Sequence, residues 1–261
     1  MSDGGCIFCG QSPQTKTHIF RKAWIDRLMV PSEGPFETIH GTADTGASHE
    51  GNWPSDEFSM APGAACAPCN NNWMDQVDRT AERIVEPMVI GHKATIRSFQ
   101  DQKAVARWVS QVVILIDQTQ IQQVVPSEIT RGFYADQEPL AGMVIWLAQT
   151  GTDWSVEGWQ RAWLLSTGTN PEPAPRPNMC LFTFRIVNLV VQAVVPLDDY
   201  ARRTFGVRRG DNMRFLRQLW PSRYTPVSWP PGVAIRSDTL NEFARTFERP
   251  GAEPGDVWWS G

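Results

Sequence analysis

Residues 6–24, CIFCGQSPQTKTHIFRKAW, and residues 66–79, CAPCNNNWMDQVDR, decide the fold that we expect. Each stretch opens with a C-x2-C pair, and the pairs supply the thiols of Cys6, Cys9, Cys66 and Cys69. Two such knuckles offer four thiolates at tetrahedral angles to one zinc ion. A zinc ion held by four cysteines has no open position and does no chemistry itself. The sequence therefore predicts a structural zinc site, and any reaction must come from residues that the zinc positions.

The order of polar residues around the knuckles resembles a known family. His18 follows the first knuckle, and Asn70 follows the second knuckle directly, where a helix is expected to start. This order is similar to that of the zinc-supported HNH endonucleases, whose ββα-metal unit runs C-x2-C, His, C-x2-C with Asn or His, and then a helix. The pair Trp73 and Met74 resembles one variant of that family. The resemblance covers roughly the first third of the chain.

The resemblance implies an activity and the residues that carry it. In that family the histidine is the general base that deprotonates a water molecule, and the polar residue at the helix start helps to hold a divalent ion against the scissile phosphate. By this comparison His18 is the base and Asn70 the ligand of Mg²⁺ or Mn²⁺. The expected function is an endonuclease that hydrolyses phosphodiester bonds, of DNA rather than RNA.

Two positions depart from the family pattern and leave a second function open. The residue before the histidine, usually Asp or Glu, is Thr17, a poor ligand for a hard divalent cation. The asparagine expected shortly before the second knuckle has no counterpart in FSMAPGAA at 58–65. The alternative is a catalytically degenerate HNH-fold protein that binds nucleic acid, a nucleotide or a protein partner.

Residues 31–65 are rich in Gly, Pro, Ser and acids and read as a long insertion between the two halves of the zinc site. One hypothesis is that a carboxylate of this loop replaces the ligand lost at Thr17, the candidates being Asp44, Glu50, Asp56 and Glu57. The alternative is an acidic, solvated loop without a metal role. The asparagines also have a structural explanation, because Asn72 followed by Asp75 fits a helix N-cap with an acid in the first turn.

The charge distribution gives a second pointer to nucleic acid. The formal net charge of −4 argues against a protein that coats nucleic acid through an overall positive field. Residues 202–223, however, hold seven arginines against the single Asp211. We expect phosphate contacts from basic residues beside the histidine and in this segment, namely Lys16, Arg21, Lys22, Arg202, Arg203, Arg208 and Arg209. The alternative is that these residues are ordinary surface charges.

The composition is that of a folded protein outside the membrane. Hydrophobic residues make up 41% of the 261 residues and charged residues 20%, and twelve tryptophans argue against disorder. No apolar run reaches membrane-spanning length, and MSDGGCIFCG lacks a signal pattern. We expect a cytoplasmic protein with no membrane association. Cys180, in MCLFTF, is expected to be a small buried hydrophobe.

The pattern along the chain predicts an α+β fold in two domains. Residues 1–92 form the expected zinc-binding HNH-like domain with the inserted loop 31–65, and residues 93–261 a larger α+β domain. Hydrophobic periodicity predicts helices at 21–29, 72–89, 101–123, 127–137 and 237–247, and in the second half of 200–219. Short β-branched and aromatic runs predict antiparallel strands at 142–150, 159–167, 179–187 and 188–197, the last two forming a hairpin near Asn188.

Overall fold

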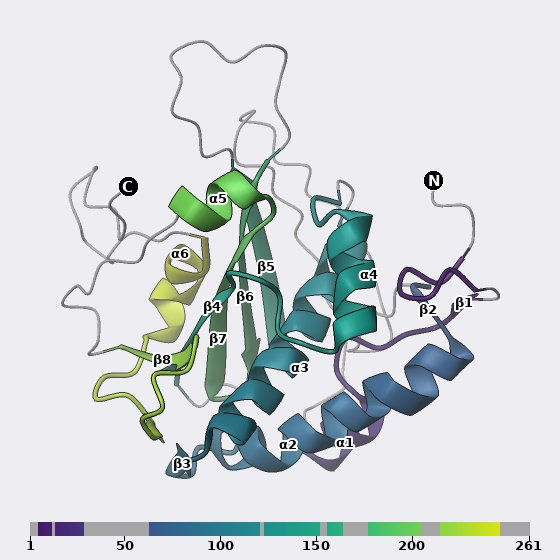
Figure 1. The fold of residues 1–261 in the computed structure, drawn as a ribbon. Coiled ribbons are helices and arrows are strands. Elements are labelled where there is room, and N and C mark those ends of the chain that lie inside the picture. Colours follow the sequence, from purple (N-terminus) through teal and green to yellow (C-terminus); the bar gives the residue numbers. More distant parts are fainter. Residues whose placement is uncertain are drawn as a thin grey trace. The chain divides into compact units, whose positions relative to one another are not determined.

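The computed structural model describes residues 5–11, 14–28, 63–120, 123–151, 156–163, 177–204 and 215–245 (Figure 1). The chain forms two compact units. Unit 1 consists of Met1–Glu86 and Gln100–Leu140, and unit 2 of Pro87–Phe99 and Ala141–Gly261. The expected α+β class with an antiparallel sheet is confirmed. Within the described ranges, no helix combines the length and the apolar character needed to cross a bilayer.

Unit 1 contains a short hairpin and the helices around it. Strand β1 (Gln14–Thr15) pairs antiparallel with β2 (Ala65–Cys66). The π-helix η1 (Cys69–Met74) then runs directly into α2 (Asp75–Val89). Helices α1 (Lys22–Arg27), α3 (Phe99–Gln118) and α4 (Ser127–Asp136) complete this part of the chain.

Helix α3 is shorter than the expected range of 101–123, and it ends for a local reason. Asp117, the residue before the last one of α3, is fully buried, and its carboxylate accepts the backbone N–H groups of Val124 (3.0 Å) and Val125 (3.2 Å). These bonds satisfy backbone donors that would otherwise be buried without partners. They hold the returning chain against the end of α3, so the helix cannot continue to residue 123.

The two units differ from the sequence-based division at residue 92, because α3 and α4 group with the cysteine-containing segment. The Trp108 ring of α3 lies 6.2 Å from the Trp24 ring of α1 and 6.2 Å from that of Phe20, measured between centroids. These large buried rings join α3 to the segment after the first knuckle. Whether 1–92 and 93–261 fold independently stays a prediction.

Unit 2 is built on an antiparallel sheet of five strands in the order β5-β6-β7-β4-β8. The four strands expected between 142 and 197 are present, and β6 and β7 are buried at every position. The fifth strand, β8, lies where the sequence predicted a helix, so that prediction is wrong. The strand bounds are β4 Val144–Gln149, β5 Val156–Trp163, β6 Met179–Ile186, β7 Leu189–Pro196 and β8 Leu216–Trp220.

The expected hairpin at Asn188 is confirmed, and its tip is tied to the end of α2. Ile186 pairs with Leu189, which leaves Val187 and Asn188 as a two-residue turn with Val187 at φ 52°. The Asn188 side chain donates to the carbonyl of Val89 (3.0 Å), and its backbone N–H donates to the same oxygen (3.3 Å). These contacts compensate for a left-handed backbone that a β-branched residue rarely adopts.

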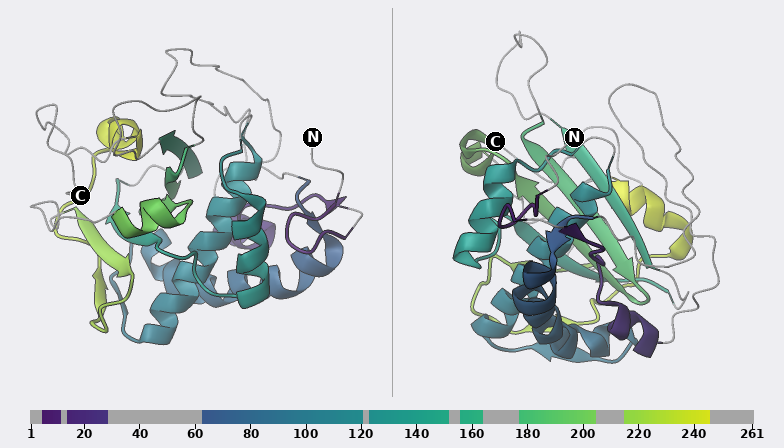
Figure 2. Two further views of the ribbon diagram at one scale, coloured as in Figure 1. Left: turned by 45° about the horizontal axis from the view of Figure 1, so that its top comes forward. Right: turned by 90° about the vertical axis from the view of Figure 1, so that its right-hand side faces the viewer.

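One face of this sheet is covered by short helices of unit 2. Helix α6 (Leu240–Arg245), entered through the 3₁₀ turn η3 (Ser237–Thr239), packs against β5 and β6 (Figure 2). Helix α5 (Asp199–Thr204) packs against β7, and β3 (Ala94–Ile96) pairs antiparallel with β9 (Val227–Trp229). The buried core here includes Trp146, Leu181, Val194, Leu240 and Phe243. Cys180 is fully buried, as expected.

Candidate metal centre

The structure brings the four knuckle cysteines together. Their sulfur atoms all lie within 4.8 Å of one another, and Cys9 Sγ is 3.5 Å from Cys66 Sγ. Four sulfurs at about 2.3 Å from a tetrahedral zinc ion are about 3.8 Å apart. The cluster therefore fits one Zn²⁺ with small adjustments, and all four cysteines are unbridged by disulfides. Zinc held in this way would be structural, because four thiolates leave no position for a substrate or water.

The first knuckle is shaped by backbone contacts that turn both thiols inward. Gly10 donates its N–H to the carbonyl of Cys6 (2.8 Å), and Cys6 donates to the carbonyl of Gln11 (2.7 Å). Gly10 has φ 76°, a conformation that glycine adopts without a steric penalty. The second knuckle begins at the end of β2 and finishes in η1. Two turns distant in sequence thus meet at one point.

The thiols differ in how readily they lose a proton. Burial alone would raise the pKa of Cys6, but backbone N–H groups, including those of Cys9 and Cys66, stabilise its thiolate and lower the pKa to about 7. Burial raises the pKa of the Cys69 thiol and that of Cys9. Zinc binds thiolates and so displaces the protons of the less acidic thiols when it enters.

Thr17, the residue at the place of the missing carboxylate, has a structural role. It is fully buried, and its hydroxyl accepts the backbone N–H of Ala65 (3.1 Å) and donates to the carbonyl of Thr15 (3.2 Å). Thr15 adds a hydrogen bond from its own hydroxyl to the Ala65 carbonyl (2.9 Å). Both threonines therefore join β1 to β2, and the Thr17 oxygen is committed to the backbone.

His18 and Asn70 lie on neighbouring segments. His18 is partly buried and follows β1 by three residues. Asn70 sits in η1, where its side-chain amide lies 3.4 Å from the carbonyl oxygen of Lys16. The proposed N-cap at Asn72 is wrong, because the helical segment is already under way there and Pro68 precedes it without a side-chain cap. Asn70 is therefore placed against the strand that leads to His18.

The residues around His18 do not by themselves fit a hard divalent cation. The four cysteines are the only group of three or more His, Cys, Asp or Glu in the described part of the chain that could hold a metal ion. A magnesium or manganese site needs several oxygen ligands. The loop candidates Asp44, Glu50, Asp56 and Glu57 lie outside the described residues, so their proposed role stays a hypothesis.

The basic residues expected to contact phosphate differ in exposure and in whether they form ion pairs. Lys16 is exposed, Lys22 pairs with Asp26 (3.0 Å), and Arg202 pairs with Asp199 (2.7 Å). Arg203 is exposed. Arg208 and Arg209 lie outside the described residues. Their contact with nucleic acid stays a prediction.

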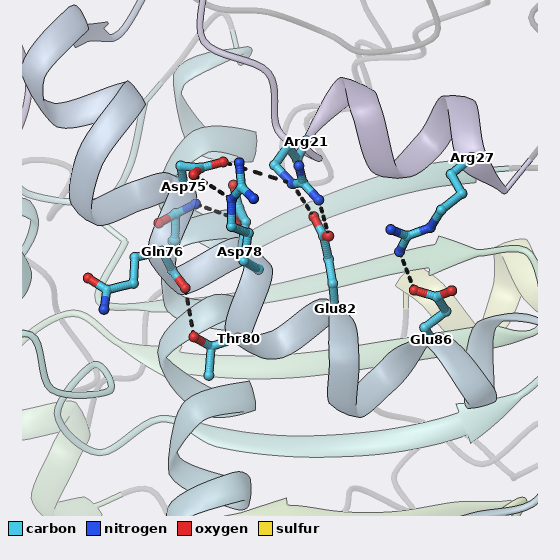
Figure 3. A network of polar contacts seen from close by, with 10 residues as sticks. Arg21, Arg27, Asp75, Gln76, Asp78, Thr80, Glu82 and Glu86 are labelled. Carbon is cyan, nitrogen blue, oxygen red and sulfur yellow. Dashed lines mark hydrogen bonds and ion pairs between the residues drawn. The ribbon is translucent and has the colours of Figure 1, made fainter.

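Arg21 belongs to a network of charges between α1 and α2 (Figure 3). Its Nε donates to Glu82 Oε1 at 2.6 Å and its Nη2 pairs with Glu82 Oε2, which makes a two-pronged ion pair. Glu82 is 3% exposed. Asp75 lies 4.0 Å from Arg21, and Arg27 pairs with Glu86 one turn further along α2. The sequence offered no local signal for this network, because the partners are about sixty residues apart.

Asp78 is a second buried carboxyl of this network. Burial raises its pKa well above the ordinary value, the negative Glu82 adds to the rise, and Arg21 offsets part of it. Gln111 of α3 donates its amide to Asp78 Oδ1 (2.8 Å). Folding therefore shifts this carboxyl towards its protonated form relative to the unfolded chain.

This difference predicts a pH dependence of stability. Because the pKa of Asp78 is raised in the folded state, this carboxyl stabilises the fold fully at pH values below its unfolded pKa near 4. That contribution is lost as the pH rises towards the folded pKa, by at most about 1.4 kcal/mol per pH unit. Asp78→Asn keeps an acceptor for Gln111 and removes the titration. We expect its free energy of unfolding, measured in urea between pH 4 and 8, to fall less than that of the original chain. A parallel fall in both proteins would contradict the assignment.

Comparisons with protein-family models, with curated proteins and with solved structures find no match. The zinc centre is therefore supported by the positions of the four sulfurs, and the likeness to HNH proteins by the order of residues around them.

Proposed function

We propose that this chain binds nucleic acid through a zinc-stapled, HNH-like ββα unit that no longer holds a catalytic ion. One observation carries the choice of binding over cleavage. The Thr17 hydroxyl, at the position where the resembled family has a carboxylate, is fully buried and bonded to the backbone of Ala65 and Thr15. The Thr17 side chain thus joins two strands, and the position of the metal-binding carboxylate holds no charged group.

The residues around the zinc unit supply phosphate contacts in this proposal. Zinc fixes the hairpin against η1, so Lys16 and His18 are held on a rigid support. Lys16 is exposed, and the exposed pair of Lys22 with Asp26 is weak enough to exchange for a phosphate oxygen. Arg21 has a different role, because its ion pair with Glu82 holds α1 against α2 and so supports the segment between β1 and α1 that carries His18.

A second candidate function is the endonuclease itself, and a separate observation favours it. The Asn70 amide lies 3.4 Å from the Lys16 carbonyl, so the residue at the helix start and the segment of His18 are neighbours, as the ββα arrangement requires. In this alternative His18 takes a proton from the attacking water. The oxygen ligands of a divalent ion would then have to come from residues outside the described ranges.

One set of measurements separates the two functions. Binding to labelled single-stranded DNA, duplex DNA and RNA is followed by fluorescence anisotropy at several salt concentrations, and cleavage is followed with Mg²⁺, Mn²⁺ or a chelator. We expect salt-dependent binding without cleavage. Lys16→Gln and Lys22→Gln should each make the negative slope of log affinity against log salt concentration shallower by about 1. Lys93→Gln, an exposed lysine in unit 2, is the matched control and should leave the slope unchanged.

The variant His18→Ala decides between the candidates. Metal-dependent cleavage by the original chain that disappears in His18→Ala would establish the second candidate and overturn the first. Absence of binding to all three nucleic acids, in protein that carries one zinc per chain, would contradict both.

A further inference from the structure

Unit 1 contains a small pocket that the proposed function does not use. One side of it is formed by Trp73, Gln76 and Val77 on the helical segment after the second knuckle. Thr80 of α2, Ala104 and Arg107 of α3, and Gln137, directly after α4, form the rest, and the volume is about 140 Å³. A cavity of about 150 Å³ accommodates a benzene molecule. The pocket is therefore large enough for one ring or a short aliphatic chain.

The charge in this pocket has one sign. Arg107 is the single ionisable residue among the described residues that line the pocket. Its Nη2 donates to Gln137 Oε1 (2.9 Å), whereas its Nε is enclosed and has no hydrogen-bond partner among the residues that the structure describes. A guanidinium carries five N–H donors and is normally matched by a carboxylate or phosphate when it is taken out of water. The lining supplies the cation and lacks the anion.

The guanidinium is also held in place before any ligand arrives. Gln137 ends α4 in the left-handed conformation with φ 55°, and its amide donates to the Tyr134 carbonyl (2.9 Å). These contacts fix the Gln137 oxygen that binds Arg107. A pre-positioned cation loses little conformational freedom when it meets an anion, which favours binding.

We propose that this pocket binds a small carboxylic acid, with the carboxylate on the Arg107 guanidinium and the apolar body against Trp73, Val77 and Ala104. A carboxylate matches the geometry of one guanidinium and carries a single charge. Phosphate, which carries more charge and no apolar part, would leave these three side chains without a partner. The guanidinium N–H groups that Gln137 does not occupy are the donors to the carboxylate.

The pocket adjoins the zinc knuckles through Trp73. The Trp73 ring lies 5.0 Å from the ring of Phe8, which sits between the first two cysteines, and 5.8 Å from that of Phe133. A ligand against Trp73 therefore changes the surroundings of an indole packed on the first knuckle. Tryptophan fluorescence is accordingly a direct signal of occupancy.

Benzoate is the probe that tests this proposal in the full-length zinc-loaded protein, by calorimetry and tryptophan fluorescence. Benzamide, its neutral analogue, and inorganic phosphate are the comparison ligands. We expect saturable binding of benzoate, none of benzamide, and none of phosphate. Arg107→Gln should weaken benzoate binding by about tenfold or more, since hydrogen bonds to a charged group are lost. Lys103→Gln removes a positive charge one turn earlier on α3 and should leave the affinity unchanged.

A second variant keeps the test valid if Arg107→Gln folds poorly. Ala104→Leu fills the pocket and retains the guanidinium, and it should also abolish benzoate binding. Zinc content and circular dichroism confirm that each variant is folded. The proposal would be overturned by equal binding of benzamide or by stronger binding of phosphate. It would also be overturned by unchanged affinity in both pocket variants, or by no benzoate binding at about 10 mM, which corresponds to a binding free energy weaker than about 3 kcal/mol.

Discussion

Replacing Cys66 by serine is expected to abolish zinc binding and to unfold the hairpin and the helix start that the zinc joins. The four sulfurs lie within 4.8 Å of one another, so each thiolate contributes one of the bonds that hold two distant turns together. Structural zinc sites in small domains contribute about 10–16 kcal/mol of apparent binding free energy at neutral pH. Loss of one ligand should therefore cost several kcal/mol.

The measurements are the zinc content per chain and hydrogen exchange. We expect one zinc ion in the original protein and none in Cys66→Ser, with backbone protection lost around residues 6–18 and 64–74. Cys180→Ala is the control, because Cys180 is buried in β6 of unit 2 and is no part of the sulfur cluster. It should retain full zinc content. Full zinc content in Cys66→Ser would show that the cluster is not the metal site.

The second large effect is expected at the ion pair of Arg21 with Glu82. Glu82 is 3% exposed, and the two-pronged contact offsets the loss of hydration of both charges. Glu82→Ala leaves the guanidinium beside the buried segment without its main partner. Breaking a buried pair in this way costs about 3–5 kcal/mol. The free energy of unfolding, from urea titration monitored by tryptophan fluorescence, should fall by that amount.

The same two helices provide a matched control. Arg27 of α1 pairs with Glu86 of α2, one turn beyond Glu82, but its side chain is 53% exposed. An exposed pair contributes about 0–1 kcal/mol, so Glu86→Ala should have little effect. The double variant Arg21→Met with Glu82→Met should recover most of the stability, because it removes both buried charges together. Equal destabilisation by Glu82→Ala and Glu86→Ala would show that burial does not govern this interface.

The extent to which the sequence anticipated the structure depends on how local each signal was. The antiparallel pairing of β6 and β7 around Asn188 followed from two short runs rich in β-branched and aromatic residues that meet at Asn188. The segment at Leu216–Trp220 was misjudged as a helix, because Leu216 and Leu219 also suit helical spacing. Its pairing with β4 decides the matter, and that partner lies about seventy residues earlier in the chain.

The four-cysteine cluster could be predicted from the sequence alone, because metal chemistry restricts which residues can bind and how closely they are spaced. The roles of the residues around it could not. The same sequence makes Arg21 a candidate phosphate ligand and Thr17 a replaced metal ligand, yet the folded chain gives Arg21 to Glu82 and Thr17 to the backbone of Ala65. Spacing along the chain determined which four cysteines come together. Only tertiary contacts decided which other polar groups are already paired, because burial makes an unpaired polar group costly wherever its partner lies in the sequence.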